Sequence, residues 1–199
     1  MLAALAGTGL SAAAGLNAFI PFVLVGMLDR FTTLVELPAS MDWISSWWAI
    51  GIGMVLLVAD VVLDKVPGVD SVSDAIQTAV RPLMGGVMFA AVSGAEQIEQ
   101  SDWWRDNPWV GAAVGVLVAG TVHAGKALSR PLVNAGTLGL GTPFVSAGED
   151  VASATVSIVA IFAPILVIGV LIAIGYVLYR VFRSRRRRRA EPLAAPPDP

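Results

Sequence analysis

Ionisable side chains recur at helical spacing in this otherwise apolar chain. Residues three, four or seven apart share one face of an α-helix. A charged side chain inside a membrane costs about 2.5–3.5 kcal/mol on insertion scales, so it is usually paired or exposed to water. We therefore expect four polar faces to meet in one cluster that binds or passes a small polar or ionic species. The faces are Asp60 and Asp64; Asp74 and Arg81; His123, Lys126 and Arg130; and Glu149 and Asp150.

A glycine-rich segment, "NAGTLGLGTPF", separates the last two of these faces. It adds Asn134, Gly136, Gly139 and Gly141 as candidate site residues, because glycine backbone can approach a ligand closely. Non-helical backbone at membrane depth must be buried in protein or line a wet cavity. The alternative is a surface loop with a turn at Pro143. The segment lacks a P-loop ending and follows no predicted strand, so nucleotide binding is not expected.

The same charges also allow a structural interpretation. The acids nearly balance the bases, so a salt-bridge network could simply fix the helix register of a non-transporting scaffold or accessory subunit. The basic face of Lys126 and Arg130 beside the glycines suggests lipid-phosphate handling as a third hypothesis. No enzyme activity is expected, because Ser129 and Ser146 lack a recognisable base and His123 has no orienting group. A single His with scattered carboxylates specifies no metal site, and no cofactor is expected.

The composition is typical of a membrane protein. Of 199 residues, 56% are hydrophobic and only 14% are charged, against about 25% in soluble domains. The absence of cysteine excludes disulfides and thiolate sites. A bilayer core of about 30 Å needs about 20 apolar residues per helix. We predict an all-α, polytopic transmembrane helical bundle of about five spans (four to six), in one domain over residues 1–182. The spans are approximately residues 3–28, 43–65, 72–95, 108–130 and 146–182.

Several residues mark the ends and interruptions of these spans. No charged residue precedes Asp29, so the first apolar segment is predicted to be a retained span and not a cleaved signal. Asn17 and Pro21 interrupt it, and Asn17 should bridge to another helix. Pro164 is expected to kink the last span. All six tryptophans precede an apolar run, as membrane-surface anchors do. They are Trp43, Trp47 and Trp48, and Trp103, Trp104 and Trp109.

An internal repeat is one interpretation of the tryptophan segments. At an offset of 60 residues, "MDWISSWWAIGIGMVLLVADVV" matches "SDWWRDNPWVGAAVGVLVAGTV" at seven positions. This similarity suggests a duplicated two-helix hairpin over residues 42–95 and 102–165. Small residues such as Gly111 and Gly115 permit close helix contacts, within the chain or in a homo-oligomer.

The C-terminal segment, residues 183–199, is basic and then rich in Pro and Ala, and we predict a disordered cytoplasmic tail. Its arginines should attract anionic lipid headgroups, and no nucleic-acid partner is expected. Five crossings then place the N-terminus outside and both tryptophan loops on the cytoplasmic side. The alternative places the tryptophan loops outside, which requires residues 131–182 to cross twice or turn back.

Three segments carry a resemblance to a known family: "AAAGLNAFIPF", "DKVPGVDSVSDAIQTAVRP" and "HAGKALSRPLVNAGTLGLGTPFVSAGED". Across about residues 10–164 the chain resembles a family of small bacterial integral membrane proteins known only as a domain of unknown function. The resemblance implies a multi-pass location in a bacterial inner membrane. It implies no activity.

Overall fold

The computed structural model describes residues 1–65, 70–95, 103, 106–137 and 141–190. Within these residues every regular element is a helix and no strand occurs, so the prediction of an all-α bundle is confirmed. The elements, with η for a 3-10 helix, are α1 (Leu2–Leu16), α2 (Phe19–Phe31), η1 (Ala39–Ser45), α3 (Trp47–Leu63), α4 (Asp70–Ser93), α6 (Pro108–Thr137), α7 (Thr142–Phe162), η2 (Pro164–Leu166) and α8 (Val167–Ala190).

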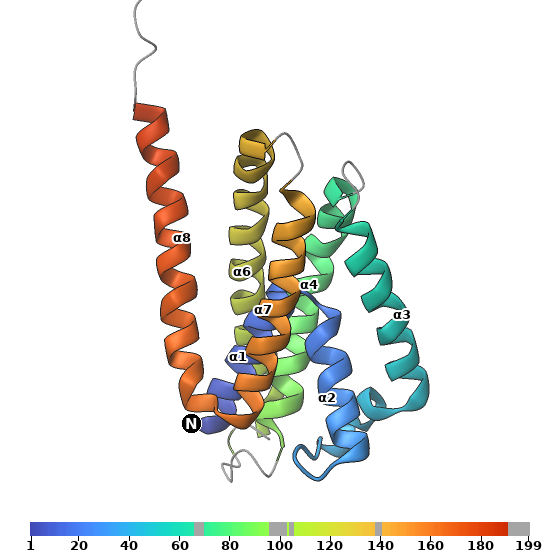
Figure 1. Ribbon diagram of the computed structural model, residues 1–199. Helices are drawn as coiled ribbons and strands as arrows, with labels where there is room; N and C mark the ends of the chain where they lie inside the picture. The colour runs from blue at the N-terminus through green and yellow to red at the C-terminus, as the bar shows by residue number, and fades with distance from the viewer. Residues whose placement is uncertain (66–69, 96–102, 104–105, 138–140, 191–199) are drawn as a thin grey trace, which may run out of the picture.

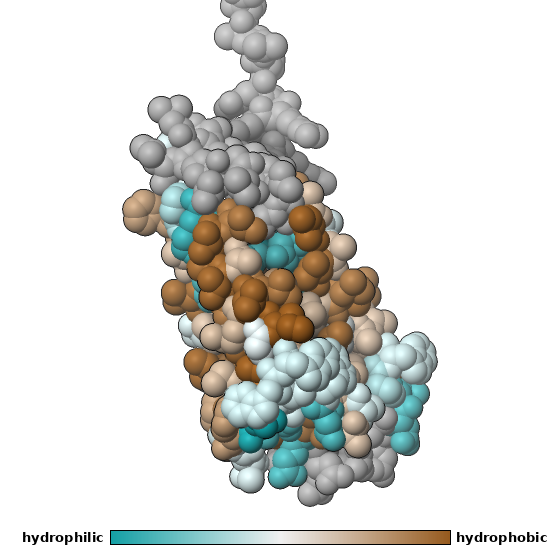
Figure 2. All heavy atoms as spheres, turned by 90° about the vertical axis from the view of Figure 1, so that its right-hand side faces the viewer, coloured by the Kyte–Doolittle hydropathy of each residue, from teal (hydrophilic) through white to brown (hydrophobic). Residues whose placement is uncertain are grey.

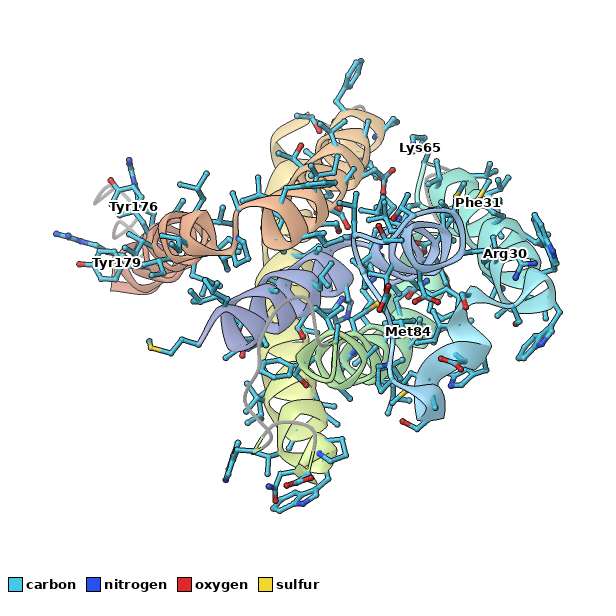
Figure 3. All side chains as sticks on the ribbon, turned by 90° about the horizontal axis from the view of Figure 1, so that it is seen from below. Arg30, Phe31, Lys65, Met84, Tyr176 and Tyr179 are labelled. Atoms are coloured by element: carbon cyan, nitrogen blue, oxygen red, sulfur yellow. The ribbon has the colours of Figure 1, made fainter. Side chains whose placement is uncertain are left out.

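The long helices alternate in direction along one axis. Figure 1 shows α3 running upward, α4 downward, α6 upward, α7 downward and α8 upward. α4 and α6 pack against each other, and α1 lies against both. α8 stands apart from this bundle, and Figure 3 shows its Tyr176 and Tyr179 at the outer edge, far from the other helices.

Three helical segments of the described chain are long and apolar enough to cross a membrane, which indicates a membrane protein. They are Ala75–Ser93, Pro108–Ser129 and Thr142–Phe162. The pair η1 and α3, bent by 55°, is a fourth candidate if it forms one span. The fold is therefore the expected helical bundle, with three or four helices that could span a membrane.

The first predicted span is wrong, because residues 3–28 do not form one crossing helix. α1 ends at Leu16, and Asn17 is extended (φ −143°, ψ 119°) before α2 begins. Figure 1 shows α1 rising from the lower end to mid-height and α2 descending to the same end. With 15 and 13 residues these helices are about 22 and 20 Å long, shorter than a bilayer core of about 30 Å. They form a two-helix hairpin, the α1–α2 hairpin, whose tip is Asn17.

Two polar or restricted residues explain this break. The Asn17 side-chain Oδ1 accepts hydrogen bonds from the backbone N–H groups of Phe19 (3.0 Å) and Ile20 (3.3 Å), and so caps α2. In a continuous helix Pro21 would remove the bond to the carbonyl of Asn17 and clash with it. In the first turn of α2 the missing N–H of Pro21 costs no helical bond.

The last predicted span is also wrong, because Pro164 ends the helix and does not merely kink it. α7 stops at Phe162, and Ala163 adopts φ −145° and ψ 65°. The ring of a proline disfavours the α conformation in the residue before it. After the short η2, α8 runs back up the bundle, antiparallel to α7 (Figure 1).

The preferred orientation, with the tryptophan loops and the arginine tail on one side, is therefore wrong as well. The tryptophans at the starts of α3 and α6 lie at the lower end of Figure 1, whereas α8 ends at the upper end. Residues 131–182 traverse the bundle twice, as the alternative required. The hairpins α3–α4 and α6–α7 fall within the two proposed repeat units, and the duplication itself stays a prediction.

The helix ends bear on two smaller expectations, the glycine-rich loop and the disordered tail. α6 continues to Thr137 and α7 begins at Thr142, so the glycine-rich segment is not a long loop. Gly136 lies within α6, and Gly139 is outside the described residues. Gly141 precedes α7 with φ −77°, which is not a left-handed conformation. α8 includes residues 183–190, and residues 191–199 are outside the described residues, so the disorder of the tail stays a prediction.

Close helix packing holds the bundle together at its centre. A Cβ built on Gly85 would lie 2.8 Å from the carbonyl oxygen of Gly115, so α4 and α6 approach as only glycine allows. The expected close contact at Gly115 is thus within the chain. Figure 2 shows a hydrophobic belt across the face that α3 presents, with paler and hydrophilic atoms below it. At that lower end Trp43 stacks on Trp48 with ring centroids 6.2 Å apart, as expected of surface anchors.

Candidate functional site

A group of charged and polar side chains gathers around the tip of the α1–α2 hairpin. They come from the end of α3, the first half of α4, the middle of α6 and the first turns of α7, which Figure 1 shows side by side in the upper half of the bundle. All but Gln77 belong to the charged groups that the sequence analysis singled out. The group, called the polar cluster below, consists of Asp60, Asp64, Lys65, Gln77, Arg81, His123, Lys126, Glu149 and Asp150.

Lys126 is the centre of the polar cluster. Its Nζ lies 3.2 Å from Asp64 Oδ2 and 2.9 Å from Glu149 Oε2, and it donates to the backbone carbonyl of Leu16 at 3.2 Å. An ammonium group has three N–H donors, so these three acceptors match it. The side chain is 2% exposed. One buried cation therefore joins α3, α7 and the end of α1.

Arg81 lies beside it, fully buried. Its Nη2 is 3.3 Å from Asp64 Oδ2 and 3.7 Å from Asp60 Oδ2. Asp60 also accepts a hydrogen bond from Gln77 Nε2 at 2.6 Å. Arg81 Nε and Nη1 have no hydrogen-bond partner among the described residues. The guanidinium therefore presents donors that the described protein groups leave unused, although unpaired buried donors cost about 1–3 kcal/mol each.

The hairpin tip enters the polar cluster through Asn17. Its Nδ2 donates to Asp150 Oδ1 at 2.9 Å, so the expected bridge to another helix is confirmed. Asp150 Oδ2 accepts from Lys65 Nζ at 3.2 Å. Lys65 is 34% exposed, and Figure 3 shows it at the edge of the bundle beside α3. A chain of polar contacts thus runs from the bundle surface to the tip.

Helix ends add to this electrostatic arrangement. The C-terminal end of a helix carries a partial negative charge and the N-terminal end a partial positive one. The C-terminal end of α1 faces the Lys126 ammonium. The Asn17 side chain accepts a hydrogen bond from the start of α2 and donates one to the Asp150 carboxylate, so it links the two. Each half-helix therefore points its terminus at the charge that it favours. Ser153 Oγ also donates to the carbonyl of Ala13 at 2.9 Å, which ties the hairpin to α7.

Most of the predicted site residues are brought together. His123 Nε2 lies 3.0 Å from Thr78 Oγ1, which joins α6 to α4. The side chains of Asp74, Arg130 and Asn134 are outside the described part of the structure.

Sequence reasoning did not assign Asn17, Gln77 or the Leu16 carbonyl to the site, and it counted Lys65 only among the bases of the charged cluster. A signal existed for Asn17, a polar residue four positions before Pro21 in an apolar segment. None existed for the carbonyl, because it becomes available only where α1 ends.

Apolar clefts lie away from the polar cluster. A groove of about 300 Å³ between α6 and α8 is lined by residues such as Leu117, Val122 and Leu171. A second of about 160 Å³ is lined by residues including Phe22, Trp48 and Met84. Their walls are those expected for lipid chains.

The described residues include no group of three or more His, Asp and Glu side chains that could hold a metal ion. No curated protein and no solved structure matches the chain. One family model does match, over residues 4–184, and it covers all the helices that build the polar cluster. This protein therefore belongs to the family described as "Domain of unknown function (DUF4126)".

Proposed function

We propose that this protein binds or passes a small polar or ionic species through the polar cluster, in the inner membrane of a bacterium. The observation that carries the proposal is the contact between the hairpin tip and the buried charges. Lys126 Nζ donates to the carbonyl of Leu16, and Asp150 Oδ1 accepts from the side-chain amide of Asn17. Discontinuous helices that end at mid-membrane are used by transporters to bind substrates and coupling ions.

The burial of the charges favours a functional site over a passive one. Buried ion pairs seldom add net stability, because desolvation offsets the Coulomb attraction. A bundle that needed only register could use fewer charges than the polar cluster holds. The unused donors of Arg81 support binding in particular, since a polar ligand would supply their partners.

We place the C-terminus in the cytoplasm, following the tendency of Lys and Arg to remain there. The tryptophan end and both ends of the α1–α2 hairpin then face outward. The arginines of α8 would meet anionic lipid headgroups at the cytoplasmic surface, at about 1 kcal/mol per charge. No catalytic role is proposed for the polar cluster, and no cofactor.

The test is flux into proteoliposomes of the purified full chain. Probes are a pH jump, gradients of NaCl and of KCl, and, by light scattering, gradients of urea and of glycerol. We expect at least one probe to pass faster than in protein-free liposomes. Asp150→Asn should lower that flux at least tenfold while the protein stays inserted and folded, because it removes the charge at the tip. Asp42→Asn, at an exposed position, is the matched control.

Absence of flux for every probe, in a protein that is folded and inserted, would contradict transport. If another membrane protein then co-purifies with this chain while the charged contacts stay intact, a scaffold or accessory subunit is favoured. Unchanged flux in Asp150→Asn would show that the species passes elsewhere.

A further inference from the structure

A buried carboxyl and a buried amide face each other between α3 and α4. Asp60 is 3% exposed and Gln77 is 6% exposed. Gln77 Nε2 donates to Asp60 Oδ1 at 2.6 Å, a short bond. The second oxygen of each group, Asp60 Oδ2 and Gln77 Oε1, has no hydrogen-bond partner among the described residues. Two buried acceptors are thus left in one side-chain pair.

Among the described carboxylates of the polar cluster, Asp60 lies farthest from a cation. Its closest cation is Arg81 Nη2 at 3.7 Å, and that same nitrogen is nearer to Asp64, at 3.3 Å. The three N–H donors of Lys126 are used by other acceptors. The charged groups around Asp60 are Asp64 at the C-cap of α3, Arg81 on α4, Lys126 on α6 and Asp150 on α7.

The charge balance among the described residues of the polar cluster also leaves one carboxylate without its own cation. Among residues whose side chains the structure describes, the polar cluster has one more carboxylate than it has Lys and Arg side chains. His123 is the other titratable side chain of α6 in it, and it contacts Thr78. The carboxylates are Asp60, Asp64, Glu149 and Asp150, and the cations are Lys65, Arg81 and Lys126.

We propose that Asp60 is a proton-binding site, in which the carboxylic acid and the Gln77 amide form a pair held by two hydrogen bonds. A hydronium ion delivers the proton: one of its O–H bonds breaks, leaving a water molecule, and an O–H bond forms at Oδ2 of Asp60. Oδ2–H then donates to Gln77 Oε1 while Gln77 Nε2 still donates to Oδ1. One added proton removes the excess negative charge and gives both unused acceptors a bond. Release returns the proton to water and restores the carboxylate.

This inference rests on the proposed function for its role: the proton is the ion that the polar cluster passes or couples to. It names a ligand that the flux test alone does not. The same geometry gives Gln77 a defined task, because leucine at that position could neither donate to Oδ1 nor accept from Oδ2–H. Gln77 is a positioning residue for the proton on Asp60.

The test is infrared difference spectroscopy of the full-length protein in lipid, titrated from alkaline to acidic pH. Wild type should gain the C=O stretching band of a protonated carboxyl, shifted down in D₂O. The band should be lost in Asp60→Asn and kept in Asp42→Asn. Gln77→Leu should move it to higher frequency, because the C=O loses the bond from Nε2.

The outcomes are distinct from those of the flux test. A band that survives in Asp60→Asn, or one unmoved by Gln77→Leu, would overturn the proton site. Asn resembles the protonated acid in shape, so Asp60→Asn should fold, and the D₂O shift in wild type is independent of any variant. Loss of the band in Asp60→Asn without flux of any probe would keep the proton site and refute transport. Flux without such a band would keep transport and refute the proton site.

Discussion

Replacement of Lys126 by Met is the sharpest test of how the polar cluster stabilises the fold. The change keeps an unbranched side chain, one heavy atom shorter, and removes one buried cation that serves Asp64, Glu149 and the carbonyl of Leu16. Removing one partner of a buried ion pair costs about 3–5 kcal/mol. At about 1.4 kcal/mol per tenfold change, the unfolding equilibrium should shift by roughly two to four powers of ten.

The assay is unfolding in detergent micelles with increasing SDS, followed by the fluorescence of the six tryptophans. Lys65→Met is the matched control. Its cation is 34% exposed and forms one ion pair with the described residues, to Asp150, and exposed pairs contribute about 0–1 kcal/mol. Adding Glu149→Gln to Lys126→Met should recover about 1 kcal/mol or more, since contacting residues couple. If Lys126→Met and Lys65→Met lose equal, small amounts of unfolding free energy, Lys126 is not the buried cation that stabilises the fold.

Two further predictions concern the elements that position the polar cluster. Asn17→Ala removes the cap of α2 and the hydrogen bond to Asp150. The free energy of unfolding should fall by about 1–3 kcal/mol in a thermal unfolding experiment. An unchanged unfolding midpoint would contradict a stabilising role of Asn17 at the hairpin tip. Gly115→Val would place a side chain against the carbonyl of Gly85, and overpacking costs about 1–3 kcal/mol. Gly51→Val, with open space around its Cβ position, should unfold nearly as wild type does, and similar losses in both would argue against the close crossing.

The sequence predicted the charged faces better than it predicted the path of the chain. Spacings of three, four and seven put Asp60, Asp64, Arg81 and Lys126 on helix faces because the helical repeat is a local property. Their meeting in one cluster followed from the cost of burying unpaired charge. Both arguments use information that lies within a few residues or in general energetics.

The breaks at Asn17 and Pro164 were harder to predict, because a proline in an apolar segment is compatible with a kink, a reversal or a helix start. The choice depends on what receives the freed backbone groups. At Asn17 those partners are Lys126 and Asp150, more than a hundred residues away in the chain. At Pro164 the reversal separates the tryptophan end from the arginine run, which the count of apolar segments could not reveal.

By itself, then, the sequence determined an all-α membrane protein of several spans with a paired set of buried charges, because composition and helical periodicity are enough for that. Only the tertiary structure decided that the first apolar segment is a two-helix hairpin, and that the Leu16 carbonyl and Asn17 at its tip complete the polar cluster. The physical reason is that a helix end exposes polar backbone groups whose partners are set by packing between distant segments. Only the tertiary structure could assign Gln77 to the polar cluster as well, because its role depends on the packing of α4 against α3, where it faces Asp60.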